Sequence, residues 1–393
     1  MLEYAGSRSG FRTQRDEGAA LMGVLRSLDW LLVAGIGGLV AVGLWAVSGV
    51  TRFDVAHNPS YYLDRQIGYA IVGLVALIVA VCIDPELYRR YWRPIYVGTV
   101  GLIAVVLLIG RAARGSTRWI NVGFFTFQPS EFGKLLFVLA LAGFLAERAR
   151  NANDPRTTLR LLGFAVLPIV LVFAQPDLGT ALVYSAATGA MLFVSGTPWR
   201  QLTALGTVAV LLVVGVLWAG PAVGVDLLKG YQKSRLTCFV QPSHCSSSYN
   251  LEQSIAAVGS GQVNGRGLNN ATQTRLNFLP EHGTDFIFAS YSEQRGFVGA
   301  ALLLALYLLV LWRGLRIVAT ARDLYCAIVA GGILVALLFQ IFVNVGMTMG
   351  IAPITGIPLP FVSVGGSSMI ANLAAMGVLL SIHARSRAVR RRR

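Results

Sequence analysis

The sequence predicts an all-α polytopic membrane protein of about ten transmembrane helices, forming a single integral membrane domain over residues 1–393. Three observations predict this class: the composition, a series of long apolar segments, and an uneven distribution of positive charge. The chain is 55% hydrophobic and only 13% charged, whereas soluble domains carry about 25% charged residues. A soluble protein could not bury so much apolar surface, because single cores stop growing at about 250 to 300 residues.

The apolar segments have the length that a membrane requires. A helix needs about 20 mostly apolar residues to cross about 30 Å of hydrocarbon. We expect spans at residues 30–50, 67–83, 94–110, 132–146, 161–174, 178–195, 202–223, 296–312, 325–345 and 367–383. The fifth and sixth segments are separated only by Gln175, Pro176 and Asp177, so the turn between them is very short.

The net charge of +15 could indicate a nucleic acid or an anionic membrane surface as partner. Lys and Arg concentrate in alternate loops, which fits the positive-inside rule and argues against a nucleic-acid patch. On this basis both termini are cytoplasmic. Residues 1–28 are a cytoplasmic N-terminal segment, and residues 384–393 are a basic cytoplasmic tail that contacts anionic lipid. We expect no nucleic-acid partner.

Residues 225–295 form a large extracellular loop between the seventh and eighth spans, rich in Gly, Ser, Asn and Gln. A loop of this length is too long for a simple connector. Two further outer segments, residues 111–131 and 347–368, interrupt the apolar pattern with Gly and Pro. Irregular backbone at membrane depth is tolerated only where it is buried in protein or lines a wet cavity. We therefore expect function on the outer side, in a cavity walled by these segments.

The densest polar cluster, residues 279–288, comes immediately before the eighth span and contains Asp285. Desolvation at the start of an apolar helix can raise the pKa of an Asp and make it a better general base. The alternative is that Thr284 or Asp285 only caps the helix N-terminus. Spacing alone favours neither interpretation.

Glu131 and Lys134 form a second cluster at helical i, i+3 spacing. A charge in hydrocarbon costs at least about 2.5 to 3.5 kcal/mol, so such residues pair or face an aqueous cavity. Pairing alone would be a structural role. Because Arg118 lies just upstream in the same irregular segment, we favour a role in contacting substrate.

Lys233 and Arg235 open the long outer loop, and Ser260 lies in a Gly-rich run further along it. Cations among small residues suit a diphosphate, although a solvated loop explains them equally well. No nucleotide-binding motif and no zinc-site spacing is present. A hard divalent cation, Mg²⁺ or Mn²⁺, bridging carboxylate and diphosphate stays open. Whether Cys238 and Cys245 pair in an oxidising exterior also stays open.

Several motifs resemble, in order, those of the SEDS family of shape, elongation, division and sporulation proteins. They lie at residues 118–120, 128–134, 175–180, 259–261, 279–286 and 358–368. The resemblance covers nearly the whole chain, and residues 26–30 and 344–348 look typical of elongation-type members. Val364 stands where the family usually has Tyr, while Gly283 and Gln294 replace the commoner His and Glu.

The resemblance implies a peptidoglycan glycosyltransferase of the bacterial cytoplasmic (inner) membrane. It would join lipid II units into β-1,4 glycan strands during cell elongation, with inversion and release of undecaprenyl diphosphate, on the extracellular side. Asp285 matches the essential Asp of the family. The residues that we expect to bind substrate are Arg118, Glu131, Lys134, Asp177, Lys233, Arg235, Ser260 and Glu281. No cofactor is implied with certainty, and the divalent cation stays open.

The partner implied by the resemblance is a class B penicillin-binding protein, a transpeptidase that crosslinks the strands. Two other functions fit the same residues. One is a lipid II flippase or lipid transporter, because an apolar cavity with buried charge suits lipid translocation. The other is a non-enzymatic scaffold of the wall-synthesis complex.

Overall fold

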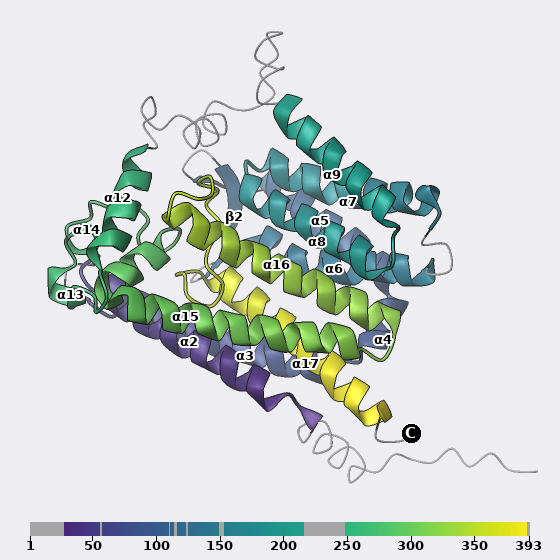
Figure 1. Ribbon diagram of the computed structural model, residues 1–393, viewed down its shortest axis with the longest axis horizontal. Coiled ribbons are helices and arrows are strands. Elements are labelled where there is room, and N and C mark those ends of the chain that lie inside the picture. The colour runs from purple at the N-terminus through teal and green to yellow at the C-terminus, as the bar shows by residue number, and fades with distance from the viewer. Residues whose placement is uncertain are drawn as a thin grey trace, which may run out of the picture.

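The computed structural model describes residues 27–55, 57–109, 111–113, 116–122, 125–148, 153–215 and 248–390. Long helices lie side by side and form a bundle (Figure 1). The short helices α12 (Ser248–Ser260), α13 (Gly267–Asn270) and α14 (Thr272–Arg275) gather at one end of it. The described part of the large outer loop therefore combines short helices within residues 248–275 with turns at residues 276–286.

Each predicted span overlaps an apolar helix of the described chain. These helices are α2 (Trp30–Val50), α3 (Tyr61–Cys82), α5 (Trp92–Ile109), α6 (Pro129–Glu147), α7 (Pro155–Ala174), α8 (Leu178–Val194), α9 (Trp199–Val214), α15 (Ile287–Thr320), α16 (Leu324–Thr348) and α17 (Gly366–Arg390). Of the described helices, 7 are long and apolar enough to cross a membrane, and two apolar helices are shorter. The prediction of a polytopic helical membrane protein is confirmed.

Three helices, α6, α16 and α17, form the centre of the bundle. Between 72% and 83% of their apolar windows is buried, against 22% for α3 and α15, whose outer faces are apolar and exposed. Helices pack closely in membranes where small residues let their backbones approach. Gly377 of α17 shows this, since a Cβ there would collide with the backbone carbonyl of Leu77 in α3. The peripheral helices thus present apolar surface to lipid while the central helices hold buried polar groups.

The outer segment at residues 111–131 forms regular structure. Strands β1 (Arg111–Ala113), β2 (Ser116–Val122) and β3 (Phe125–Phe127) make an antiparallel sheet in the order β1-β2-β3. Helix α6 then begins at Pro129, because the fixed φ of proline suits the first position of a helix. The sheet lies directly before the Glu131 and Lys134 cluster, which falls on the first two turns of α6.

Helix α15 begins at Ile287, earlier than the predicted start at Gly296. Residues 287–295 are largely polar, so hydropathy does not include them. Gly296 still marks a real break, with non-helical backbone at φ 66° and ψ −165°. The N–H groups of Phe297 and Val298 donate to the carbonyls of Gln262 (2.7 Å) and Val263 (3.1 Å). The break therefore attaches the outer loop to α15.

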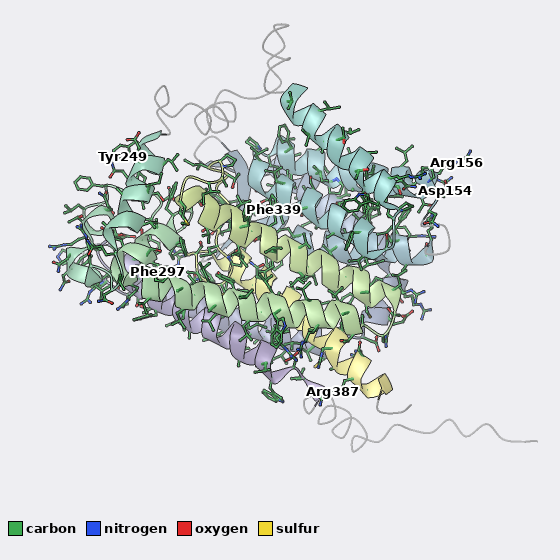
Figure 2. The ribbon with its side chains drawn as sticks, in the orientation of Figure 1. Asp154, Arg156, Tyr249, Phe297, Phe339 and Arg387 are labelled. Atoms are coloured by element: carbon green, nitrogen blue, oxygen red, sulfur yellow. The ribbon has the colours of Figure 1, made fainter. Side chains whose placement is uncertain are left out.

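The described chain begins with α2 and ends with α17 at the same end of the bundle, away from α12 (Figure 1). Figure 2 places Tyr249 of α12 at one end and Asp154 at the other. This arrangement agrees with an even number of crossings. Which end faces the cytoplasm stays a prediction.

Asp29 and Arg313 join α2 to α15 at the end away from α12. The Asp29 side chain is 2% exposed and caps α2 by accepting from the Leu32 N–H at 3.2 Å. The Arg313 Nε lies 2.8 Å from Asp29 Oδ2. Breaking a buried pair of this kind leaves an uncompensated charge, so both residues anchor the start of the first span.

Arg322 and Asp323 form the short connection between α15 and α16. Asp323 Oδ2 lies 2.8 Å from Arg322 Nε, and Asp323 Oδ1 accepts from the Cys326 N–H at 2.8 Å. Burial alone would raise the pKa of Asp323, but the hydrogen bond from Cys326 and the Arg322 guanidinium together lower it. The ionised carboxylate therefore stabilises the start of α16.

Candidate functional site

Asp285 lies on a turn, residues 279–286, that leads into α15. The start of α15 lies beside α12 (Figure 1). Glu281 has a positive φ of 56°, and its carbonyl accepts from the N–H groups of Thr284 (3.1 Å) and Phe286 (3.2 Å). Phe286 occupies the N-cap position of α15, so neither Thr284 nor Asp285 does. The Asp285 side chain is half-buried, at the boundary between the packed helices and the outer loop.

A small apolar cluster holds α12 against this turn. Ala257 of α12 packs with Leu279, Phe286 and Ala289, which are all buried. On the other side, His282 Nε2 lies 2.9 Å from Asp54 Oδ1 in the α2–α3 loop. The turn that bears Asp285 therefore lies between α12 and the α2–α3 loop.

The irregular segment at residues 349–365 also packs against the turn. Its middle is buried, and the Tyr307 hydroxyl of α15 donates to the Pro360 carbonyl. The Val364 N–H donates to the Gly283 carbonyl at 2.9 Å. The irregular backbone of this segment is thus enclosed by protein, an arrangement that the interior of a membrane would require.

Glu131 and Lys134 form a buried ion pair on α6, as their spacing indicates. Lys134 Nζ lies 2.8 Å from Glu131 Oε2, and the two residues are 8% and 2% exposed. Lys134 Nζ also donates to Gln340 Oε1 of α16 at 2.9 Å. Beside the pair lies a cavity of about 30 Å³, also lined by Asn372 of α17. That volume is large enough to admit water. It is far too small for a sugar.

Asp177 caps α8 in the short turn between α7 and α8. Its Oδ1 accepts from the Thr180 N–H at 3.1 Å, and its Oδ2 accepts from Gln128 Nε2 at 3.3 Å. Gln128 also accepts from the Trp119 indole N–H of β2 at 3.1 Å. Asp177 is 2% exposed. The structure thus gives it a structural role, and its contact with substrate stays a prediction.

Ser260 is the last residue of α12, and Glu281 lies on the turn that bears Asp285. The Ser260 hydroxyl donates within α12 to the Ala257 carbonyl at 3.0 Å. Residues 260–266 line an open cleft of about 370 Å³. The Glu281 carboxylate accepts from the Thr284 hydroxyl at 3.0 Å. Ser260 therefore faces open space, whereas Glu281 braces the turn that carries Asp285.

Three predicted cations lie outside the part of the chain whose side chains the structure describes. Lys233 and Arg235 lie between the described residues 215 and 248, together with Cys238 and Cys245. Arg118 lies on β2, but its side chain is not among those described. Among the predicted site residues with described side chains, Lys134 is the one cation. No group of three His, Cys, Asp or Glu side chains in the described chain could hold a metal ion.

The sequence reasoning missed a polar stripe on α16. Gln340 and Asn344 stand one helical turn apart in an apolar span, at 2% and 0% exposure. Gln340 contacts Lys134, while Asn344 Nδ2 donates to the carbonyls of Asp285 (2.9 Å) and Ile357 (2.7 Å). The i, i+4 spacing of two amides in hydrocarbon was the available signal. The stripe connects the ion pair of α6 to the turn that bears Asp285.

A comparison with protein families matches residues 26–388 to the FtsW, RodA and SpoVE family, described as cell cycle proteins. Peptidoglycan glycosyltransferase MrdB of Escherichia coli is 35% identical over 347 residues, covering 88% of this chain and 92% of that protein. Stage V sporulation protein E of Bacillus subtilis is 36% identical over 362 residues, covering 91% and 95%.

Solved structures show the same fold. A chain from a peptidoglycan synthase complex, described as coordinating polymerisation and crosslinking, superposes with a TM-score of 0.77 at 30% identity, covering 91% of this chain and 98% of that chain. The rod shape determining protein RodA of Thermus thermophilus superposes with a TM-score of 0.66 at 29% identity, covering 91% and 96%.

Proposed function

This chain belongs to the FtsW, RodA and SpoVE family and is a multi-pass membrane glycosyltransferase of peptidoglycan synthesis. From that premise we propose that it polymerises lipid II into β-1,4 glycan strands during cell elongation. The relatives named peptidoglycan glycosyltransferase, which cover most of the chain, support the reaction class. We place the reaction on the extracellular side of the bacterial cytoplasmic membrane, at the end of the bundle that carries α12.

The observation that carries the proposal is the half-buried Asp285 on the turn between the outer loop and α15. There the carboxylate can contact the sugar head group of lipid II while the lipid chain lies among the helices. Asp285 would take the proton of the 4-hydroxyl of the acceptor sugar as that oxygen bonds the anomeric carbon of the donor. The bond from that carbon to the diphosphate breaks, and undecaprenyl diphosphate leaves. A single displacement inverts the α linkage of the donor to β.

The leaving diphosphate needs positive charge where its own charge develops. We assign that role to Arg118, Lys233 and Arg235, with a divalent cation as an alternative source of the same charge. Lys134 is paired with Glu131 and reaches only a cavity of about 30 Å³. Its charge would therefore act on substrate through bound water, or after α6 and α16 separate.

We propose a class B penicillin-binding protein as the partner that crosslinks the new strands. The structural match to a chain of a synthase complex that couples polymerisation with crosslinking supports this. The partner would lie in the same membrane.

The experiment compares purified protein in detergent with the same protein in sealed vesicles. In detergent, with lipid II and a divalent cation, a polymerase forms glycan strands that are visible by gel electrophoresis, with or without the transpeptidase. A flippase forms none in detergent, because transport requires two compartments, but moves labelled lipid II across the vesicle membrane. Absence of polymer in every detergent condition, together with transport in vesicles, would replace the proposed function by lipid translocation.

A further inference from the structure

The turn that carries Asp285 is held in place by hydrogen bonds that its backbone carbonyls accept. Three consecutive carbonyls each accept a hydrogen bond from a different donor in the C-terminal part of the chain. These bonds join Gly283 to the Val364 N–H (2.9 Å), Thr284 to the Ser363 hydroxyl (2.6 Å), and Asp285 to the Asn344 amide (2.9 Å). Such a series fixes the rotation of the peptide groups on either side of the Asp285 side chain.

Asn344 of α16 forms hydrogen bonds with two irregular segments, the turn at residues 279–286 and the segment at residues 349–365. Its Nδ2 donates both to the Asp285 carbonyl at 2.9 Å and to the Ile357 carbonyl at 2.7 Å. The side chain is 0% exposed on α16, in the centre of the bundle. Because both protons of the amide are used, a side chain of similar size without donors would leave two carbonyls unsatisfied.

Ser363 and Gln66 form further hydrogen bonds with the irregular segment at residues 349–365. The Ser363 hydroxyl accepts from the Leu359 N–H at 2.8 Å while it donates to Thr284. Gln66 of α3 donates to the Ser363 carbonyl at 3.1 Å and accepts from the Gly365 N–H at 3.2 Å, and it is 0% exposed. The turn is thus connected through the segment to α3 as well as to α16.

We propose that Asn344 is a positioning residue that sets the orientation of the Asp285 carboxylate, an inference that rests on the proposed function. Asp285 lies outside α15, so helical hydrogen bonds do not hold it. A general base must lie within about 2.6 to 3.2 Å of the proton that it removes. A displacement of about 1 Å can lower the rate about 10²-fold. Without the Asn344 amide, the turn relieves its unsatisfied carbonyl by moving, and the carboxylate moves with it.

The test is Asn344→Leu, which keeps the approximate volume and removes both donors. We expect kcat for lipid II polymerisation to fall about 10- to 100-fold, with KM within about twofold of the wild-type value. The matched control is Thr348→Val, one turn further along α16. Thr348 is also 0% exposed, but its hydroxyl donates within the helix to the Val345 carbonyl at 2.7 Å. This control should keep the wild-type kcat.

If gel filtration in detergent shows that Asn344→Leu does not fold, Ser363→Ala tests the proposal in its place. It removes one of the three bonds, and we expect kcat to fall about threefold to tenfold at unchanged KM. A folded Asn344→Leu protein with wild-type kcat overturns the proposal. So does a loss confined to KM. If Asn344→Leu does not fold, wild-type kcat in Ser363→Ala overturns it.

A double variant separates positioning from a general structural effect. If Asn344 acts through Asp285, adding Asn344→Leu to Asp285→Asn lowers the residual rate by less than about twofold, because coupled residues are not additive. A full additional loss would overturn the proposal. Asp285→Asn alone reports on the proposed function. If it polymerises like the wild type, the proposed function fails whatever the Asn344 variants do.

Discussion

Replacing Lys134 by Met tests the energetics of the buried pair on α6. The substitution keeps an unbranched apolar stem and removes the ammonium group. Glu131 then loses the Nζ donor at 2.8 Å while it stays 2% exposed. Gln340 Oε1 loses a donor as well.

The expected loss in free energy of unfolding follows from the burial of the Glu131 and Lys134 pair. Breaking a buried ion pair by removing one partner destabilises a protein by about 3 to 5 kcal/mol, because an uncompensated charge is left. The cavity of about 30 Å³ beside the pair admits water to the Glu131 carboxylate and puts the expected loss near the lower value, about 3 kcal/mol. Glu131→Gln combined with Lys134→Met removes both charges. That double variant should recover most of the loss, to within about 1 kcal/mol of the wild type.

The assay is the free energy of unfolding from SDS titration of each purified protein in mixed micelles. A free energy of unfolding for Lys134→Met within 1 kcal/mol of the wild-type value would refute the reasoning. So would a double variant that is no more stable than Lys134→Met alone. Polymerisation by the double variant then separates two roles of the pair. A stable protein that makes no polymer indicates a contact with substrate, and a stable and active one indicates a structural pair.

Two further predictions concern stability. Gly296→Ala should destabilise by at least about 1 to 3 kcal/mol in the same titration, because an L side chain at φ 66° is strained and its Cβ would collide with the outer-loop backbone. Gly68→Ala, in the interior of α3 and with nothing near its Cβ, should leave stability unchanged or raise it by up to about 1 kcal/mol, and a loss equal to that of Gly296→Ala would contradict the argument. Asp323→Ala should destabilise by about 1 kcal/mol at neutral pH, because it removes a helix cap. Since the pKa of Asp323 is lowered in the fold, its stabilisation is lost as pH falls through that value, so variant and wild type should converge in acid and a constant gap would argue against it.

The bundle was predictable because hydropathy depends on local composition. Each expected span overlaps a helix, and boundaries differ where polar residues continue a helix beyond the apolar core. Helix α15 extends back to Ile287 for this reason, and α17 continues to Arg390, through most of the predicted tail. The sheet at residues 111–127 was missed, since two of its strands have only 3 residues each, too few for an alternating pattern to indicate a strand.

The candidate site was only partly predictable. Asp285 and the pair of Glu131 and Lys134 stand out in sequence because charges are rare near apolar helices. The amides that surround them do not, since their partners are distant: Gln66 donates to a carbonyl 297 positions later, and Asn344 to one 59 positions earlier. Hydropathy cannot say which distant backbone group a buried amide satisfies.

The central claim is that the Asp285 carboxylate removes the proton in glycosyl transfer. The most direct measurement is the rate of lipid II polymerisation by purified Asp285→Asn, a substitution of nearly equal shape, at saturating lipid II. We predict a fall of at least about 10²-fold, the value of a general base, with unchanged affinity for lipid II and unchanged folding. A rate within threefold of the wild type would contradict the account.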